Sequence, residues 1–356
     1  MSGACLEFEN PINDAISRIR FAPQSNSLLI SSWDSNLRLY DVDSFMLRLE
    51  AAPAEGALLD CCFQNDSVAF TAGSDCFLRR YDLHSGIHNT IGNHDDSATC
   101  VEYSDETCQV ITAGWDKRIM FWDPRMSNAL GGLKFLGAEV ESMSLSMFNL
   151  MVAIGASVHT YDLRNLDKAV QGKESCMDLR LRCVRSISNS KGFTVGSIDG
   201  RVALEILNPS NSNDIGYAFR CHPKSKDGRD HLVAVNDIVF NPSYVRLLIV
   251  AYYFRWGKLA LIGCFWFSDC GAFVTGDNEG YVIAWDARSR KRLFELPRYP
   301  NSVASLSYNY GGQLLAVAST YTYQEANELE EPPRIFIHRM DDGYIESVSA
   351  GRSSRK

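Results

Sequence analysis

The stretch GWDKRIMFWDPR, residues 114–125, combines a turn, a short apolar run and a Trp-Asp pair. The pattern recurs along the 356-residue chain, with steps of 41, 41, 39, 44 and 80 residues between anchors at Tyr40, Tyr81, Trp122, Tyr161, Glu205 and Trp285. Five of the six anchors are followed by Asp, and each has an aliphatic residue three positions before it. Five of six also have an acidic residue six positions before. A period of about forty residues that ends in Trp-Asp is typical of the WD40 repeat.

Each repeat contains short apolar runs separated by turn residues, which is typical of β-strands. In the first repeat they are ISRIRF (16–21), SLLISSW (27–33), LRLYD (37–41) and MLRLE (46–50). Four strands form one propeller blade, and blades stack because a single blade cannot bury both of its faces. Counting the innermost runs predicts an all-β, seven-bladed WD40 β-propeller over residues 5–340, followed by a polar tail at 341–356. The last repeat has three strands, so we expect the N-terminal CLEFEN (5–10) to supply its fourth and close the ring.

The composition indicates a folded intracellular protein. Lys plus Arg is 35 and Asp plus Glu is 43, and the net charge of −8 argues against direct nucleic-acid binding. The 11 cysteines form no Cys-x-x-Cys pair, so we expect no metal site in the protein. Their pattern also indicates a reducing, intracellular compartment. No phosphate-binding glycine loop or activated nucleophile is present, so we expect no enzymatic activity and no cofactor. His94 with Asp116 and Trp122 allows a catalytic interpretation, but the pattern favours a buried network that holds the turns.

One segment of the sixth blade breaks the spacing. The acidic residue six positions before an anchor is here termed the turn acid. From the last aromatic residue of the innermost run to the turn acid, the first three blades have 12 or 13 residues, whereas the sixth has 39. The excess is residues 243–268, of which 19 of 26 are apolar. Arg255 and Lys258 interrupt the apolar runs, which are too short to span a membrane. We expect the blade to be complete without this segment. It is then either a stretch without a structural role, such as translated intron sequence, or an apolar docking patch.

One face of the predicted propeller is rich in basic residues. With the strands of a blade lettered a to d from the inside outward, the b–c turns and the d–a loops share one face, here termed the top face. They carry Lys117, Arg118, Arg180, Arg182, Arg201, Lys224, Lys226 and Arg229. These are either scattered solvated charges or a docking surface for an acidic or phosphorylated peptide. Trp33 and Trp115 stand directly before turn acids at the rim, where an aromatic side chain can contact a partner.

Several stretches resemble one family of WD40 proteins. They are SSWDSNLRLYDVD (31–43), TYDLRN (160–165), GSIDGRVALE (196–205), YAFRCH (217–222), RYPNSVASLSY (298–308) and QLLAVASTYTY (313–323). Over nearly the whole chain the sequence is similar to the mitotic-checkpoint family called budding-uninhibited-by-benzimidazole type three. The related nuclear-pore mRNA-export propeller shares GRVA and the Cys-His step, but SSWD with RLYD, and TYDLRN, favour the checkpoint family.

The resemblance implies a non-enzymatic adaptor of the spindle-assembly checkpoint. It implies a nuclear protein that is found at the kinetochore or centromere in mitosis, and also on the spindle and in the cytoplasm. The implied partners are a GLEBS-type segment of a checkpoint kinase or pseudokinase, and phosphorylated MELT-type repeats of the kinetochore scaffold; membranes are not among them. The alternatives are a nuclear-pore mRNA-export adaptor and the substrate receptor of a ubiquitin ligase.

The resemblance also implies roles for individual residues. Trp33, Trp115 and Arg182 correspond to residues that contact the partner peptide, with Arg182 facing its acidic groups. Arg201, assisted by Arg220, corresponds to the phosphate reader. The alternative for Arg201 is an ion pair with a neighbouring turn carboxylate. Directly after the Cys-His step the family has a basic residue, where this chain has Pro223, so one positive contact to the phosphate is expected to be missing.

Overall fold

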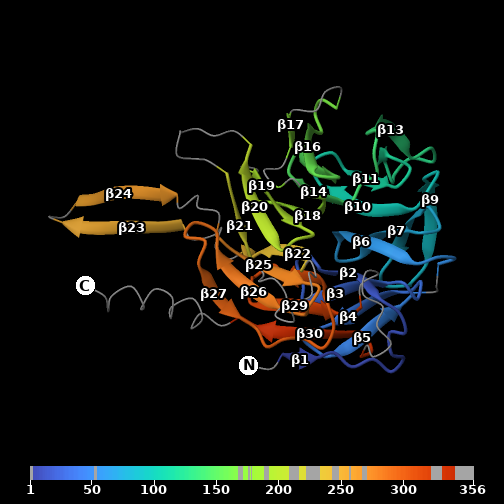
Figure 1. Ribbon diagram of the computed structural model, residues 1–356, viewed down its shortest axis with the longest axis horizontal. Coiled ribbons are helices and arrows are strands. Elements are labelled where there is room, and N and C mark those ends of the chain that lie inside the picture. The colour runs from blue at the N-terminus through green and yellow to red at the C-terminus, as the bar shows by residue number, and fades with distance from the viewer. Residues whose placement is uncertain are drawn as a thin grey trace.

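The protein is a ring of β-sheets in the computed structural model, which describes residues 3–51, 54–166, 171–174, 177, 179–187, 192–207, 216–221, 233–242, 248–255, 258–266, 271–321 and 331–340. Within these ranges the elements are all strands, and no helix is long and apolar enough to cross a membrane. Seven four-stranded antiparallel sheets are arranged around a common centre (Figure 1). The seven-bladed propeller predicted from the repeat is therefore confirmed.

The blades follow the repeats in the sequence. Blade 1 is β2 (Ile16–Phe21), β3 (Ser27–Ser32), β4 (Leu37–Asp41) and β5 (Met46–Glu50), and blade 2 is β6 (Leu58–Asn65), β7 (Val68–Gly73), β8 (Phe77–Asp82) and β9 (His88–Asn93). Blade 3 is β10 (Ala98–Ser104), β11 (Gln109–Gly114), β12 (Arg118–Trp122) and β13 (Leu130–Phe135), and blade 4 is β14 (Ser142–Ser146), β15 (Asn149–Ile154), β16 (Ser157–Asp162) and β17 (Gln171–Glu174). Blade 5 is β18 (Leu181–Ser186), β19 (Gly192–Ser197), β20 (Arg201–Ile206) and β21 (Tyr217–Arg220).

The last two blades are not built from four consecutive strands. Blade 6 is β22 (Val235–Phe240), β25 (Ala272–Asp277), β26 (Val282–Asp286) and β27 (Arg292–Glu295). Blade 7 is β28 (Val303–Tyr308), β29 (Leu314–Ser319) and β30 (Arg334–Arg339), completed by β1 (Ala4–Cys5) from the other end of the chain. Ala4 pairs with Ile337, and the N–H of Leu6 donates to the carbonyl of Ile335 at 2.8 Å. The N-terminus therefore closes the ring as predicted, with a shorter strand than CLEFEN.

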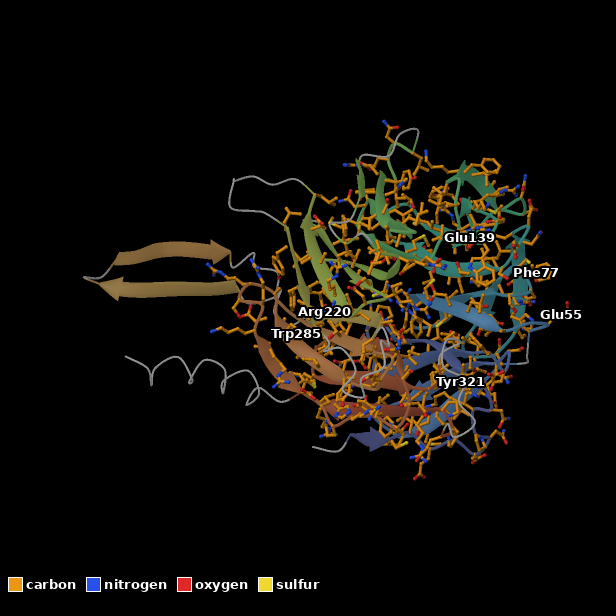
Figure 2. The ribbon with its side chains drawn as sticks, viewed as in Figure 1. Glu55, Phe77, Glu139, Arg220, Trp285 and Tyr321 are labelled. Atoms are coloured by element: carbon orange, nitrogen blue, oxygen red, sulfur yellow. The ribbon has the colours of Figure 1, made fainter. Side chains whose placement is uncertain are left out.

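The hydrophobic core lies between the blades. Seven clusters of buried apolar side chains occur in the described residues, and each joins two neighbouring blades. Between blades 5 and 6, for example, Phe219 packs against Trp285 with ring centroids 5.2 Å apart. Figure 2 labels Trp285 on the blade 6 side of this cluster. Because each sheet buries its faces only against its neighbours, the ring has to close for the end blades to be stable.

The Asp that follows five of the six anchors holds a turn on the face opposite the top face. The carboxylate of Asp123 accepts hydrogen bonds from the backbone N–H and the guanidinium of Arg125, and Asp162 does the same with Arg164. These arginine hydrogen bonds lower the pKa of both carboxyls to about 2. The repeated Asp is therefore explained by turn geometry, without a ligand.

Charged side chains of the innermost strands join neighbouring and more distant blades around the centre of the ring. Asp237 of blade 6 is fully buried and pairs with Arg185 of blade 5 at 2.5 Å and with Arg18 of blade 1 at 3.3 Å. Arg20 of blade 1 pairs with Glu102 of blade 3 at 2.7 Å. Since buried charges are tolerated only when they are paired, these contacts restrict how the blades can be arranged.

The long segment of blade 6 forms a hairpin of its own. Strands β23 (Leu248–Arg255) and β24 (Lys258–Trp266) pair with each other in a separate two-stranded sheet, which Figure 1 shows beside the ring. The blade itself pairs β22 directly with β25, from Val235 opposite Asp277 to Phe240 opposite Phe273. All four strands of blade 6 are thus present without the hairpin.

Candidate peptide-binding face

Trp33 and Trp115 occupy equivalent places on the top face, in the b–c turns of blades 1 and 3. The N–H of Trp33 donates to the carbonyl of Ala15 at 2.8 Å, and that of Trp115 to the carbonyl of Ser97 at 3.0 Å. Trp33 is half-buried and meets the ring of Tyr321 edge to face at 6.4 Å, whereas the side chain of Trp115 is 49% exposed. Both indoles therefore lie at the rim, as the sequence predicted.

Arg182 lies where the innermost strand of blade 5 begins. It is the bulged residue of β18, between Leu181 and Cys183. Five other innermost strands have a bulge at the same place, with Ser17, Leu59, Thr99, Asn236 and Ala304 as the extra residues. Arg182 is the one charged side chain in this ring of positions, and it has no ion-pair partner among the described residues. A half-buried cation without a partner is suited to bind a carboxylate.

In the described part of the chain, most other cations of this face are already paired. Arg180 forms an ion pair with Glu141, and Arg118 pairs with Asp95. Lys117 is exposed and, within the part of the chain that is described, forms no ion pair. It lines a cavity of about 440 Å³ between blades 3 and 4, together with Gly137, Ala138, Glu139, Glu141, Gly155, Ala156 and Arg180. Among the described members of the positive neighbourhood predicted from sequence, Arg182 and Lys117 are therefore the ones without an ion pair.

Arg201 and Arg220 lie together over one carboxylate. They are opposite one another in the β20–β21 pair, and Nε of Arg201 lies 2.7 Å from Oδ2 of Asp199. A terminal nitrogen of Arg220 lies 3.2 Å from the same oxygen, and its other one donates to the carbonyl of Asp199. The alternative interpretation of Arg201, a pair with a turn carboxylate, is therefore what the structure shows for the free protein. The sequence analysis did not assign Asp199 to this site.

The charge on Asp199 is maintained by its neighbours. Burial alone would raise the pKa of this carboxyl, but the hydrogen bond from Ser197 and the charge of Arg201 hold the pKa below its ordinary value. The two guanidiniums remain 30% and 39% exposed. A site with two cations, one anion and access from solvent can bind a dianion if the carboxylate gives up part of its contacts.

The His94 constellation holds a turn of blade 3. His94 is buried, with Nδ1 2.9 Å from Asp116 and Nε2 2.7 Å from the hydroxyl of Thr112, and Trp122 Nε1 donates to the same hydroxyl at 2.7 Å. Burial lowers the pKa of His94 in spite of the neighbouring Asp116. The predicted buried network is confirmed, because all of these polar groups are satisfied by one another.

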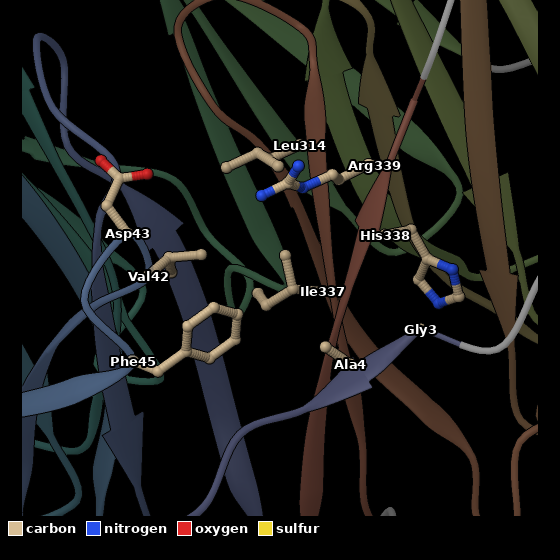
Figure 3. Close-up of a pocket in the computed structure, with 9 residues that line it drawn as sticks. All are labelled: Gly3, Ala4, Val42, Asp43, Phe45, Leu314, Ile337, His338 and Arg339. Atoms are coloured by element: carbon tan, nitrogen blue, oxygen red, sulfur yellow. The ribbon is translucent and has the colours of Figure 1, made fainter.

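A second cavity, of about 300 Å³, lies at the seam where blade 7 meets blade 1. It is lined by Gly3, Ala4, Val42, Asp43, Phe45, Leu314, Ile337, His338 and Arg339 (Figure 3). The Phe45 ring forms an apolar wall beside Ile337, and the seam cavity contains none of the residues that the sequence assigned to partner binding.

Comparisons with known proteins agree with the fold and identify the family. The WD domain, G-beta repeat family matches residues 6–41 and 87–123. Mitotic checkpoint protein BUB3.3 of Arabidopsis thaliana is 51% identical over 96% of this chain and 100% of its own length, and BUB3.1 of the same plant is 39% identical over 94% of this chain and 93% of its own. The chain belongs to the BUB3 family of mitotic checkpoint proteins.

Membership of the BUB3 family confirms the resemblance seen in the sequence. The fold also agrees with a solved structure, that of U3-55K, with a TM-score of 0.74 over 94% of this chain and 98% of the other. At 15% identity that similarity concerns the fold alone.

Some of the residues singled out by sequence lie outside the described residues of this BUB3 family member. They are Pro223, Lys224, Lys226 and Arg229, together with the tail at 341–356. Of the five assigned to partner binding, the structure brings Arg201 and Arg220 into one site and places Trp33, Trp115 and Arg182 in blades 1, 3 and 5 of the same face.

Proposed function

We propose that this BUB3 family member is a non-enzymatic adaptor of the spindle-assembly checkpoint. Its top face binds a GLEBS-type segment of a checkpoint kinase or pseudokinase, and phosphorylated MELT-type repeats of the kinetochore scaffold. The observation that carries the proposal is Arg182, an arginine without an ion pair among the described residues, on the same face as two rim tryptophans. The protein is accordingly nuclear and joins kinetochores in mitosis.

The peptide-binding part rests on Arg182. Its guanidinium has the planar fork that binds a carboxylate through two hydrogen bonds, which an ammonium group cannot reproduce. The rim tryptophans add apolar contact area at low entropic cost, as is usual where a few residues dominate binding. An acidic, partly apolar segment is therefore the class of ligand that fits this face.

Calorimetric titration with a GLEBS-type peptide tests this part. Arg182→Ala is expected to weaken binding by about 2–5 kcal/mol if the ion pair is buried in the complex. Arg182→Lys should recover only part of the loss. Arg164→Ala is the matched control, because Arg164 is an exposed arginine on the opposite face. Unchanged affinity of Arg182→Ala would remove Arg182 from the site.

The phosphate-reading part rests on Arg201 and Arg220. A phosphothreonine brings a charge of about −1.5 to −2 and three acceptor oxygens. It can therefore replace Asp199 as the partner of both guanidiniums. Charge-assisted hydrogen bonds of this kind contribute about 1.5–3 kcal/mol each. Binding of a MELT-type peptide should thus depend on phosphorylation.

Fluorescence anisotropy with paired phosphorylated and unphosphorylated MELT-type peptides tests this part. The parent protein is expected to bind only the phosphorylated peptide measurably, and Arg201→Ala should remove most of the difference. Equal affinity for the two peptides in the parent protein would contradict the phosphate reader and favour an export adaptor. Imaging of the tagged protein through mitosis, with recovery of its partners, tests the kinetochore assignment.

A further inference from the structure

The outermost strand of blade 3, β13, exposes apolar residues to an unusual degree. Its sequence is LGGLKF, and the side chains of Leu130, Leu133 and Phe135 are 42%, 45% and 66% exposed. Exposed positions on the outer strands β5, β9, β21 and β27 are mainly polar, with Arg48, Asn89, Thr90, Asn93, Arg220, Arg292 and Glu295 among them. Edge strands are usually protected by charged residues, because an apolar edge invites another strand to pair with it.

The outer edge of β13 is free for pairing. The strand is the last in the sheet order β10-β11-β12-β13, so among the described residues one row of its backbone groups faces no further strand. Leu133 and Phe135 share one side of the sheet, and Gly132 and Lys134 share the other. Lys134 Nζ lies 5.1 Å from the ring centre of Tyr161 in blade 4. Leu133 and Phe135 therefore face away from blade 4.

The charges on and beside this edge favour an acidic ligand. Lys134 is the only charged residue of β13, and its ammonium group donates one hydrogen bond, to the carbonyl of Leu166 at 2.8 Å, but keeps its positive charge. The Arg118 guanidinium, which also pairs with Asp95, lies 4.9 Å from the ring centre of Phe135. Two copies of β13 paired with each other would bring like charges together, which is unfavourable for directly opposed residues. A segment with a carboxylate in the middle avoids this repulsion.

We propose that β13 is a second docking site, where an extended partner segment with an apolar–acidic–apolar triplet adds to blade 3 as a fifth strand. In an antiparallel pair, the two apolar residues lie against Leu133 and Phe135, and the acidic residue lies opposite Lys134. Backbone hydrogen bonds provide the affinity and the side chains provide the specificity. This site uses none of the five residues assigned to the top-face ligands. The proposal can therefore be tested independently of the proposed function.

Fluorescence anisotropy with a labelled peptide, Ser-Thr-Ile-Glu-Val-Thr-Ser-amide, tests the proposal on the full chain. The parent protein is expected to bind it, and the double variant Leu133→Glu with Phe135→Glu should bind at least about tenfold more weakly, because two apolar contacts are lost. Thr90→Glu, at an exposed position of the outer strand of blade 2, is the matched control and should bind like the parent. Both substituted positions of the double variant are on the surface, and thermal unfolding verifies that the variant is folded.

Two further measurements separate strand addition from other modes of binding. Methylation of alternate peptide nitrogens should abolish binding, and hydrogen exchange of the β13 amides should slow when the unmodified peptide is bound. A peptide with Lys in place of Glu should bind about tenfold more weakly. Absence of binding, equal binding by the double variant, or equal binding of the methylated peptide would overturn the proposal. Dimerisation through β13 in sedimentation experiments, abolished by Phe135→Glu, would also overturn it by making a second copy the occupant.

Discussion

Blades 3 and 5 carry the same short pattern in their b–c turns, an Asp followed two residues later by Arg, yet the two turns differ in accessibility. In blade 3, Asp116 is held by the buried His94, and Arg118 reaches outward to Asp95 and Phe135. In blade 5, Asp199 is held by Ser197 and by two partly exposed arginines. The residue between acid and arginine has positive φ in both turns, 64° at Lys117 and 80° at Gly200, so the backbone is alike.

The difference shows that the partner of the turn acid decides what the turn can do. An imidazole supplied by the preceding loop closes the blade 3 turn into a buried network that contributes to stability. Two arginines leave the blade 5 turn charged and accessible, so the same acid there becomes part of a candidate anion site. Four experiments test this contrast, beginning with the one expected to show the largest effect.

His94→Ala is expected to destabilise the protein by about 3 kcal/mol, because Asp116 and Thr112 would each lose a hydrogen-bond partner in a buried site. Urea unfolding measures the loss. The matched change in blade 5, Ser197→Ala, should cost less, because Asp199 retains both of its arginines. Equal losses in the two variants would contradict the distinction between a stabilising turn and a binding turn.

Asp199→Asn is expected to tighten binding of a phosphorylated MELT-type peptide by about fivefold. The substitution removes the internal anion that competes for two guanidiniums, and partly exposed ion pairs are worth about 0.2–1 kcal/mol each. Anisotropy titration measures the change, with Asp116→Asn as the blade 3 control that leaves affinity unaltered. Weaker binding by Asp199→Asn would show that Asp199 orients the arginines for the phosphate instead of competing with it.

The two turns should lose stability in different pH ranges. Burial lowers the pKa of His94 below its ordinary value, so between the folded pKa and about 6.5 the unfolded chain binds more protons and stability falls as pH falls. The pKa of Asp199 is also lowered, so its contribution is present above about pH 4 and is lost only below that.

Urea unfolding between pH 7 and 4 measures this separation. His94→Gln should reduce the slope of stability against pH in that range, whereas Asp199→Asn should leave it unchanged. The slope should persist in part, because burial lowers the pKa of His338 to about 4 and this histidine adds its own contribution. A slope unaltered by His94→Gln would show that His94 does not couple protonation to folding.

Deletion of residues 243–268 should have the smallest effect. Blade 6 pairs β22 with β25 directly, and the N–H of Asn241 donates to the carbonyl of Ala272 at 3.1 Å, so the ends of these two strands are joined without the hairpin. We expect cooperative unfolding, with a free energy within about 0.5 kcal/mol of the parent. Thermal and urea unfolding of both forms provide the measurement, and aggregation of the shortened chain would show that the hairpin belongs to the folded unit.

Much of the fold could be predicted from the sequence because the repeat is visible there as a regular spacing of similar residues. The turn acids, anchors and innermost strands recur at fixed spacing, so the number of blades and the closing role of the N-terminus follow. In blade 6 the spacing predicts Glu279, six residues before the anchor Trp285, as the turn acid. The structure has Asp277 in that role, because the N–H groups of Glu279 and Tyr281 both donate to the Asp277 carboxylate.

The sequence by itself determined the ring, its seven blades and which residues lie on the top face. Local spacing is enough for that, because strands and turns are set by residues close together in the chain. Only the tertiary structure decided which cations remain available, since an ion pair joins residues whose distance in space does not follow from their separation in sequence. Arg180 is neutralised by Glu141 from the preceding blade, and Arg201 shares Asp199 with Arg220. Arg182 has no ion pair among the described residues.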